Sequence, residues 1–252
     1  MLMQRSRDLK VKALLTGLGC GVLLVSMAKA SSEKESASQM VDSGTFTILV
    51  KGQPVASENF SVQQKSGAST IKSQIKESGG ASQDSELQLT PTGEIIRYEW
   101  HELNPGKAQL VLVPNDQFLK ETTIATPGDK PAELPFLLPA STAVLDNNFF
   151  VHRQVLAWRY LSQNCKPLAG KMQCAITPAD FGAVVPQDHS SMRVTLELKG
   201  KESVAVHGTQ RELMRVNLKT DTGEWSMWLD DGDHFKLIRI SIAADNTEVV
   251  RD

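Results

Sequence analysis

The sequence predicts a mainly β protein: a single large antiparallel, strongly curved sheet or open barrel of about 11–13 strands, with one principal α-helix at about residues 146–162. Three observations predict this fold class. Most of the chain alternates apolar and polar residues with the period of two that is typical of half-buried strands. Gly-, Pro-, Asn- and Asp-containing turn signals separate these stretches. Only residues 144–161 show a long helical periodicity.

Residues 1–30 have the organisation of a secretory signal peptide. Basic residues lie between Arg5 and Lys12, an apolar run covers residues 11–27, and Ala28-Lys29-Ala30 forms an A-x-A cleavage site. The alternative is a retained membrane anchor, but the run contains three glycines and is short for a span of about 20 residues. We therefore expect cleavage near Ala30 and a periplasmic or secreted mature protein.

The charge of the mature chain bears on its partners. Without residues 1–30, Lys plus Arg falls from 27 to 22 and Asp plus Glu from 29 to 28, which gives a net charge of about −6. A mildly acidic surface of mixed sign argues against a nucleic-acid partner. We also expect that the protein is not an integral membrane protein once the signal is cleaved.

The mature chain reads as a polar, flexible segment at residues 31–43 followed by one β-barrel-like domain at residues 44–252. Phe46, Ile48 and Val50 share one side of the first strand. Six more strands are expected before the helix, at about residues 60–62, 69–75, 87–89, 94–101, 108–113 and 118–124.

Residues 125–140 contain four prolines, so they are not expected to form a regular helix or a central strand. The segment is nevertheless apolar at Leu134, Phe136, Leu137 and Leu138. We interpret it as a crossing segment that lies over another part of the domain, such as one end of the barrel.

The helical segment has a broad apolar face with a polar seam. Two stripes flank the seam: Val144, Val151, Val155 and Trp158 form the first, and Leu145, Phe149, Leu156 and Tyr160 form the second. Asn148, His152 and Arg159 fall in the narrow gap between them. Asp146 or Asn147 is the expected N-cap, where an acidic group also suits the positive end of the helix.

Cys165 and Cys174 are the two cysteines of the mature chain, and they flank a Pro- and Gly-containing loop just after the helix. An even count in an exported chain favours a disulfide. A redox or metal pair is the alternative, but eight intervening residues fit neither a C-x-x-C motif nor a zinc knuckle.

About six strands are expected after the disulfide loop. Met192, Val194, Leu196 and Leu198 alternate strictly with polar residues and give the clearest strand pattern. Further strands follow at about residues 204–206, 214–218, 224–230, 234–242 and 247–250. Asp231-Gly232 is a dipeptide that favours tight hairpins.

The motifs of catalysis and metal binding are missing from the sequence. The five histidines do not have the spacing of a zinc helix or strand, although a site assembled from distant strands stays open. No G-x-S-x-G elbow or Walker loop occurs. His189 beside Ser190-Ser191 reads as a polar loop, and Asp230, Asp231 and Asp233 read as a hairpin tip. We expect no enzyme activity, no cofactor and no metal.

The polar seam and the aromatic residues are the candidates for binding. Trp225, Met227 and Trp228 suit either a hydrophobic core, which we favour, or the lining of a ligand cavity. His152 and Arg159 point the same way, seven residues apart. They are satisfied by buried groups of the strands, presented to a cavity as a ligand headgroup site, or directed to the surface. The candidate ligand-binding residues are thus His152, Arg159, Trp158 and Tyr160.

The order of elements resembles a group of exported bacterial β-barrel domains without assigned function. These are similar in turn to the periplasmic lipoprotein-carrier superfamily, whose open, curved barrel has helices on its concave face. The residues that carry the resemblance are Gly44-Thr45-Phe46, the helix start at residues 144–148, and residues 225–230 and 237–240. The resemblance implies an apolar concavity under the helix.

Three functional hypotheses follow. The first is a periplasmic or cell-envelope binding module that holds a lipid, an acyl chain or an apolar segment of an envelope protein against the helix, with His152 and Arg159 near the polar end. The second is a structural or protein-interaction domain with a filled core. The third, which ranks last, is a hydrolase.

Overall fold

The computed structural model of the protein describes residues 37–168 and 171–252. The predicted signal peptide, residues 1–30, lies outside the described residues. The predicted flexible segment at residues 31–43 is wrong for residues 39–43, because these already pair as a strand with residues 62–64 and their neighbours on the next strand.

The first half of the main sheet is an antiparallel meander in which each strand pairs with the next one in sequence. Its strands are β1 (Gln39–Val50), β2 (Gln53–Lys65), β3 (Ala68–Glu77), β4 (Ser82–Leu89), β5 (Ile95–Asn104), β6 (Gln109–Asn115), β7 (Phe118–Ile124) and β8 (Ala132–Phe136). β8 comes from the proline-rich segment and forms one edge of the sheet, where a strand tolerates Pro135.

The second half is a meander of later strands, joined to the first because the last strand pairs with β1. It contains β12 (Ala179–Val185), β13 (Ser190–Val206), β14 (Thr209–Thr220), β15 (Gly223–Asp230), β16 (Lys236–Ile242) and β17 (Thr247–Arg251), with a short 3-10 helix, η1 (Pro186–Asp188), between β12 and β13. The two-residue strand β9 (Ala143–Val144) pairs in parallel with β12 and forms the other edge.

One α-helix, α1 (Val151–Asn164), connects the halves. A hairpin of β10 (Cys165–Leu168) and β11 (Lys171–Cys174) follows it directly. The predicted disulfide between Cys165 and Cys174 is confirmed, and it joins the two ends of this hairpin.

The predicted fold class is confirmed: the protein is mainly β, with one large curved sheet that does not close into a barrel, and one helix. Three details of the prediction are wrong. The main sheet has fifteen strands in place of about 11–13: β8, β9 and β12 are additional to the predicted strands, whereas the strands predicted at about residues 192–198 and 204–206 are one strand, β13. The sheet is mixed because β9 and β12 are parallel. The helix begins at Val151 and not near residue 146.

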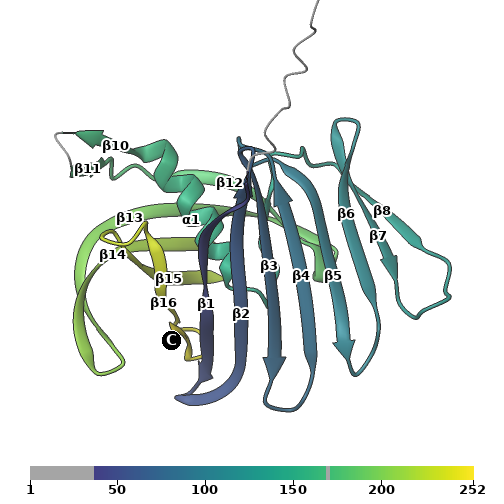
Figure 1. Ribbon diagram of the computed structural model, residues 1–252, viewed down its shortest axis with the longest axis horizontal. Helices are drawn as coiled ribbons and strands as arrows, with labels where there is room; N and C mark the ends of the chain where they lie inside the picture. The colour runs from purple at the N-terminus through teal and green to yellow at the C-terminus, as the bar shows by residue number, and fades with distance from the viewer. Residues whose placement is uncertain (1–36, 169–170) are drawn as a thin grey trace, which may run out of the picture. The chain divides into compact units, whose positions relative to one another are not determined.

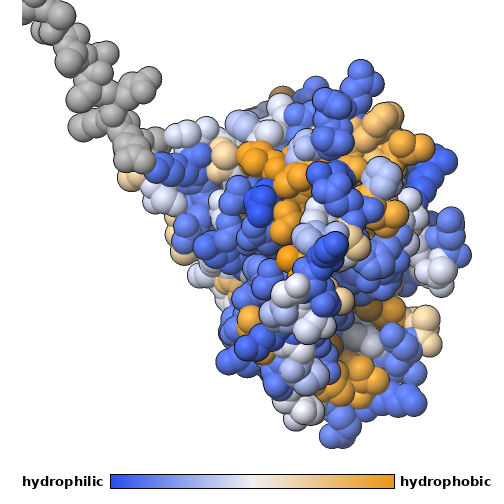
Figure 2. All heavy atoms as spheres, turned by 90° about the vertical axis from the view of Figure 1, so that its right-hand side faces the viewer, coloured by the Kyte–Doolittle hydropathy of each residue, from blue (hydrophilic) through white to orange (hydrophobic). Residues whose placement is uncertain are grey.

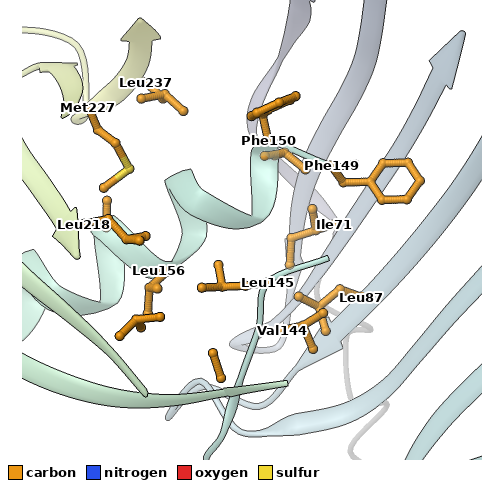
Figure 3. Packing of buried hydrophobic residues seen from close by; sticks show 14 of the residues in the cluster. Ile71, Leu87, Val144, Leu145, Phe149, Phe150, Leu156, Leu218, Met227 and Leu237 are labelled. Atoms are coloured by element: carbon orange, nitrogen blue, oxygen red, sulfur yellow. The ribbon is translucent and has the colours of Figure 1, made fainter. Parts of the chain in front are cut away.

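The sheet bends so strongly that its two halves face each other across the helix. Strands β1–β7 stand upright in Figure 1, whereas β13–β15 run across them, with α1 between. Side chains from both halves meet the helix in one buried core. In Figure 3, Leu156 and Leu145 lie between Leu218 and Met227 on one side and Leu87 and Val144 on the other.

A second, smaller apolar cluster packs on the opposite face of β13–β16. It consists of Val204, Val206, Leu213, Trp228 and Ile238, with Val250 against it. Trp225, three residues from Trp228 on the same strand, packs against the main core, so the two tryptophans lie on opposite faces of β15. Gly200, at a register shift of β13, has a φ of 106° that only glycine adopts readily.

Apolar side chains also appear on the outside of the domain. Figure 2, which looks at the right-hand side of Figure 1, shows orange groups interrupting the polar surface. Leu137, just after β8, is 79% exposed, and Phe118 and Leu134 are also exposed. No helix in the described part of the chain is both long and apolar enough to cross a membrane.

A buried ion pair joins the first strand, the last strand and the helix. The Asp42 carboxylate accepts hydrogen bonds from Arg251 at 2.7 and 3.0 Å, and its side chain is 1% exposed. It also accepts a bond from Gln154 Nε2 of α1 at 2.8 Å. The Arg251 guanidinium lies 5.2 Å from the centre of the Phe60 ring. This cluster therefore links β1, β17 and α1 at the place where the two halves of the sheet meet.

We predict that Asp42→Ala lowers the free energy of unfolding by about 3 kcal/mol, because it leaves the largely buried Arg251 without its carboxylate and the buried Gln154 amide without its acceptor. Glu133→Ala is the control: it breaks the Lys120–Glu133 pair, which is solvent-exposed, and the change should stay below about 1 kcal/mol. Denaturant unfolding measures both values. Equal stability of Asp42→Ala and the wild type would contradict this account.

Candidate ligand pocket between the helix and the sheet

A pocket of about 330 Å³ lies between α1 and strands β3 and β4. The turn after β4 and the segment leading into β9 complete its wall. Its apolar lining is Leu87, Leu89, Pro91, Ala143, Val144, Val155, Leu156 and Trp158. Its polar and glycine lining is Gln64, Ser69, Thr90, Thr92, Gly93, Thr142, His152, Arg159 and Ser162. The pocket is therefore apolar in its walls, with two basic side chains from the helix.

The helix that carries these side chains is capped by a residue far away in the sequence. Its N-cap position is Phe150, which makes no side-chain cap, so the predicted cap by Asp146 or Asn147 is wrong. The Glu58 carboxylate of β2 instead accepts the backbone N–H groups of Phe150, at 2.7 Å, and Val151, at 3.2 Å. Ser73 Oγ donates to the same carboxylate at 2.7 Å. A carboxylate from a distant strand thus caps the helix in place of a side chain at the N-cap position.

Glu58 is fully buried, and this burial raises its pKa to about 7. The hydrogen bonds from Ser73 and from the two backbone groups, together with the charge of Arg153, lower the pKa but do not offset the loss of hydration. Near neutral pH the anchor of the helix therefore exists in both protonation states.

Three further hydrogen bonds fix the rotation of α1 about its axis. Gln154 Oε1 accepts the backbone N–H of Leu237 at 2.7 Å, while its amide nitrogen reaches Asp42. Trp158 Nε1 donates to the carbonyl of Phe235 at 2.8 Å. With these residues directed towards β1 and β16, His152, Val155 and Arg159 are left on the side of the helix that borders the pocket.

Beside the pocket, the turn that precedes the helix is held by a buried polar cluster, in which Arg153 Nε has no hydrogen-bond partner among the described residues. The Asp146 carboxylate accepts a hydrogen bond from the Tyr98 hydroxyl, and burial raises the pKa of Asp146 to about 6. Buried Arg153 donates to the backbone carbonyls of Asp146 and Phe149, and its guanidinium lies 4.7 Å from the centre of the Trp225 ring. Burial lowers the pKa of Arg153 to about 10.

Within the described residues, His152 is one of three side chains of α1 with buried nitrogens that lack a hydrogen-bond partner; the other two are Arg153 and Arg159, each at Nε. His152 is 1% exposed, and neither ring nitrogen has a hydrogen-bond partner among the residues that the structure describes. Its neighbours are the rings of Tyr98, at 5.8 Å, and Phe149, at 5.7 Å between centroids. Burial, assisted by the charge of Arg153, lowers the pKa of His152 to about 3. The imidazole is therefore neutral at physiological pH, with one free donor and one free acceptor.

Arg159 lies two turns further along the helix and is partly exposed. Its Nη1 donates to the carbonyl of Ser141 at 2.8 Å, and its Nε, which is buried, has no partner within the described part of the chain. Burial lowers its pKa, and the charge of Glu94 opposes this shift. No acidic side chain among the described residues forms a salt bridge with it. The guanidinium carbon lies 5.5 Å from the centre of the Phe181 ring. Arg159 thus borders the pocket as a cation held by Ser141 and Phe181, with one unpaired but buried N–H group.

The structure brings together three of the four predicted ligand-binding residues. His152, Trp158 and Arg159 line the pocket, whereas Tyr160 does not. The Tyr160 hydroxyl donates to the carbonyl of Thr177 at 2.9 Å and accepts the N–H of Leu198 at 3.0 Å. Sequence reasoning missed the wall from β3, β4 and β9, because no local pattern indicates which strands face the helix.

The other residues considered as catalytic or metal-binding candidates form hydrogen bonds or salt bridges within the domain. His189 Nδ1 is hydrogen-bonded to the buried carboxylate of Glu121, and burial raises the pKa of Glu121. Asp233 pairs with Lys236 at the hairpin tip. Within the described residues, no group of three or more His, Cys, Asp or Glu side chains is placed to hold a metal ion.

The buried Glu58 makes stability depend on pH. Its pKa is about 7 in the folded protein and about 4.5 in the unfolded chain, so the folded state binds more protons between these values and the Glu58 contribution to stability falls as pH rises. We predict that the stability of the wild type relative to Glu58→Gln falls by about 3 kcal/mol between pH 4.5 and 8.

Denaturant unfolding at a series of pH values measures this difference. Glu212→Gln, at an exposed position, is the matched control for the loss of one carboxylate from the chain. A difference for Glu58→Gln that does not change with pH would rule out titration of Glu58 in this range.

We also compared the chain with protein-family models, with curated proteins and with solved structures, and found no match in any of the three. The pocket between α1 and β3–β4 is therefore described from the residues of this chain alone.

Proposed function

We propose that the protein is an exported binding module of the periplasm or cell envelope that holds one small, largely apolar ligand in the pocket between α1 and β3–β4. The signal-peptide pattern of residues 1–30 and the disulfide of Cys165 and Cys174 support export to an oxidising compartment. The pocket walls support an apolar ligand body.

The observation that carries the proposal is the pocket itself, a space of about 330 Å³ between α1 and the sheet. Its walls are mainly apolar, and the burial of apolar surface favours binding of an apolar ligand. A filled structural core would leave no space of this size, because protein interiors are close-packed. A ligand in the pocket would cover these walls, which makes a binding role the better account.

The size of the pocket limits the ligand. A volume of about 330 Å³ is near the lower end of the range of about 300–1,000 Å³ that is typical of small-molecule sites. One acyl chain or one compact apolar molecule suits this volume better than the several chains of a lipoprotein anchor. The proposed relation to lipoprotein carriers therefore concerns the curved sheet with its helix, and not the cargo.

We predict that Val155→Trp weakens binding of an apolar naphthylamine dye at least about tenfold, since the indole fills a pocket of this size. Val155 lines the pocket and is not fully buried, so the fold should tolerate the change. Gln163→Trp is the matched control, because it adds the same side chain to an exposed position of α1 that does not line the pocket.

Fluorescence titration measures the dye affinity, and thermal melts check the fold of each variant. Saturable binding by the wild type and by Gln163→Trp, with loss in Val155→Trp, supports the proposal. Equal binding by all three proteins, or no saturable binding by the folded wild type, contradicts it and favours the structural domain.

A further inference from the structure

The hairpin that follows α1 stands apart from the main sheet. β10 and β11 form a two-stranded sheet of their own, which Figure 1 shows beyond the C-terminal end of the helix. A two-stranded hairpin by itself is only marginally stable in water. The disulfide of Cys165 and Cys174, which lie directly opposite each other on the two strands, holds the base of the hairpin together.

Large apolar side chains lie at the end of the hairpin away from the disulfide. Leu168 is 57% exposed and Met172 is 48% exposed. Leu168 is opposite Lys171, and Met172 is opposite Pro167, which is also exposed. Because these two pairs are neighbours in the register, the exposed apolar side chains form one surface and are not scattered singly. Such a surface indicates a binding partner.

The apolar side chains lie on both faces of the hairpin. Residues directly opposite each other on paired strands share a face, and successive residues of a strand point to opposite faces. Pro167 and Met172 therefore share one face with the disulfide, whereas Leu168 lies on the other face. A folded protein that packs on one face would leave the other face in water. A layer of acyl chains surrounds the end of a hairpin and covers both faces.

The charge of this segment suits an anionic surface. Residues 147–179 contain no Asp or Glu and four Lys or Arg residues, although the mature chain as a whole is acidic. Lys166 and Lys171 belong to the hairpin itself. The next acidic residue in the sequence, Asp180, forms a salt bridge with Arg193. An anionic surface therefore attracts the hairpin more than the rest of the protein.

We propose that the β10–β11 hairpin docks the protein on the surface of a bilayer that contains anionic phospholipid. Leu168 and Met172 reach the acyl chains, and the charges of Lys166 and Lys171 stay among the lipid phosphates. The hairpin enters only as far as the boundary between headgroups and acyl chains, where the edges of its strands still reach water. Because α1 lines the pocket and leads directly into the hairpin, docking holds the pocket near the membrane. Docking does not require an occupied pocket.

Co-sedimentation with large unilamellar vesicles tests the docking with the exported, disulfide-bonded protein at low ionic strength. We expect partition onto phosphatidylcholine vesicles with about 30% phosphatidylglycerol to be about tenfold stronger than onto pure phosphatidylcholine. The double variant Leu168→Ser, Met172→Ser should lower partition onto the anionic vesicles about fivefold or more, since it removes the apolar end. The double variant Lys166→Gln, Lys171→Gln should remove the preference for anionic vesicles.

Two matched controls carry the same substitutions elsewhere on the surface. Leu134→Ser with Leu137→Ser removes two exposed apolar side chains in and just after β8. Lys107→Gln with Lys130→Gln removes two exposed charges outside the hairpin. Both controls should partition like the wild type. Thermal melts check that every variant is folded.

Loss in both hairpin variants, with both controls unchanged, supports the docking. No vesicle binding by the wild type, unchanged partition of either hairpin variant, or equal losses in hairpin and control variants overturns it. Self-association through the hairpin without vesicle binding also overturns it, in favour of a second copy of the chain as the partner. Dye binding in the pocket is measured without vesicles, so failure of the docking leaves the proposed function standing.

A second measurement needs no variant. Amide hydrogen exchange of the wild type, with and without anionic vesicles, reports protection along the chain. We expect slower exchange in peptides that cover residues 165–174 and unchanged exchange in β8. Vesicle-bound protein whose hairpin exchanges as fast as in the free protein would show that another surface makes the contact.

Discussion

The structure depends on the contact between the Glu58 carboxylate and the first backbone N–H groups of α1. It joins β2 to a helix that follows it by more than ninety residues, in a site that water does not reach. Without Glu58, the backbone N–H groups of Phe150 and Val151 would be buried and unpaired. A buried carboxylate without those donors would be equally unfavourable. Each partner therefore requires the other, and together they set the depth at which the helix enters the curved sheet.

The pocket follows from the distribution of the other contacts of the helix. Gln154 reaches β1 and β16, Trp158 reaches the residue before β16, and Tyr160 reaches β13. Among the described residues, no side chain of α1 is hydrogen-bonded to β3 or β4. The helix is thus held by β1, β2, β13 and β16, which belong to both halves of the sheet, and Val155, His152 and Arg159 border the space on the side of β3 and β4.

The sequence predicts the fold class because residue alternation is a local property of strands. It also predicts the seam of His152 and Arg159, since the seven-residue spacing keeps them on one side of any helix that contains both. The sequence does not predict where the helix begins, because the cap is Glu58 of β2 and no residue near the helix start indicates the boundary. It also fails for Tyr160, because periodicity does not distinguish a side chain that borders the pocket from one that bonds Thr177 and Leu198. Contacts between distant strands decide both cases.

The central claim is that the pocket between α1 and β3–β4 holds a ligand in the native protein. Native mass spectrometry of the protein purified gently from its own host tests this most directly, with Val155→Trp expressed and purified in parallel. The account predicts a bound small molecule of defined mass on the wild type that is absent from the folded Val155→Trp protein. Wild-type protein that carries no bound molecule, or the same adduct on both proteins, would contradict it.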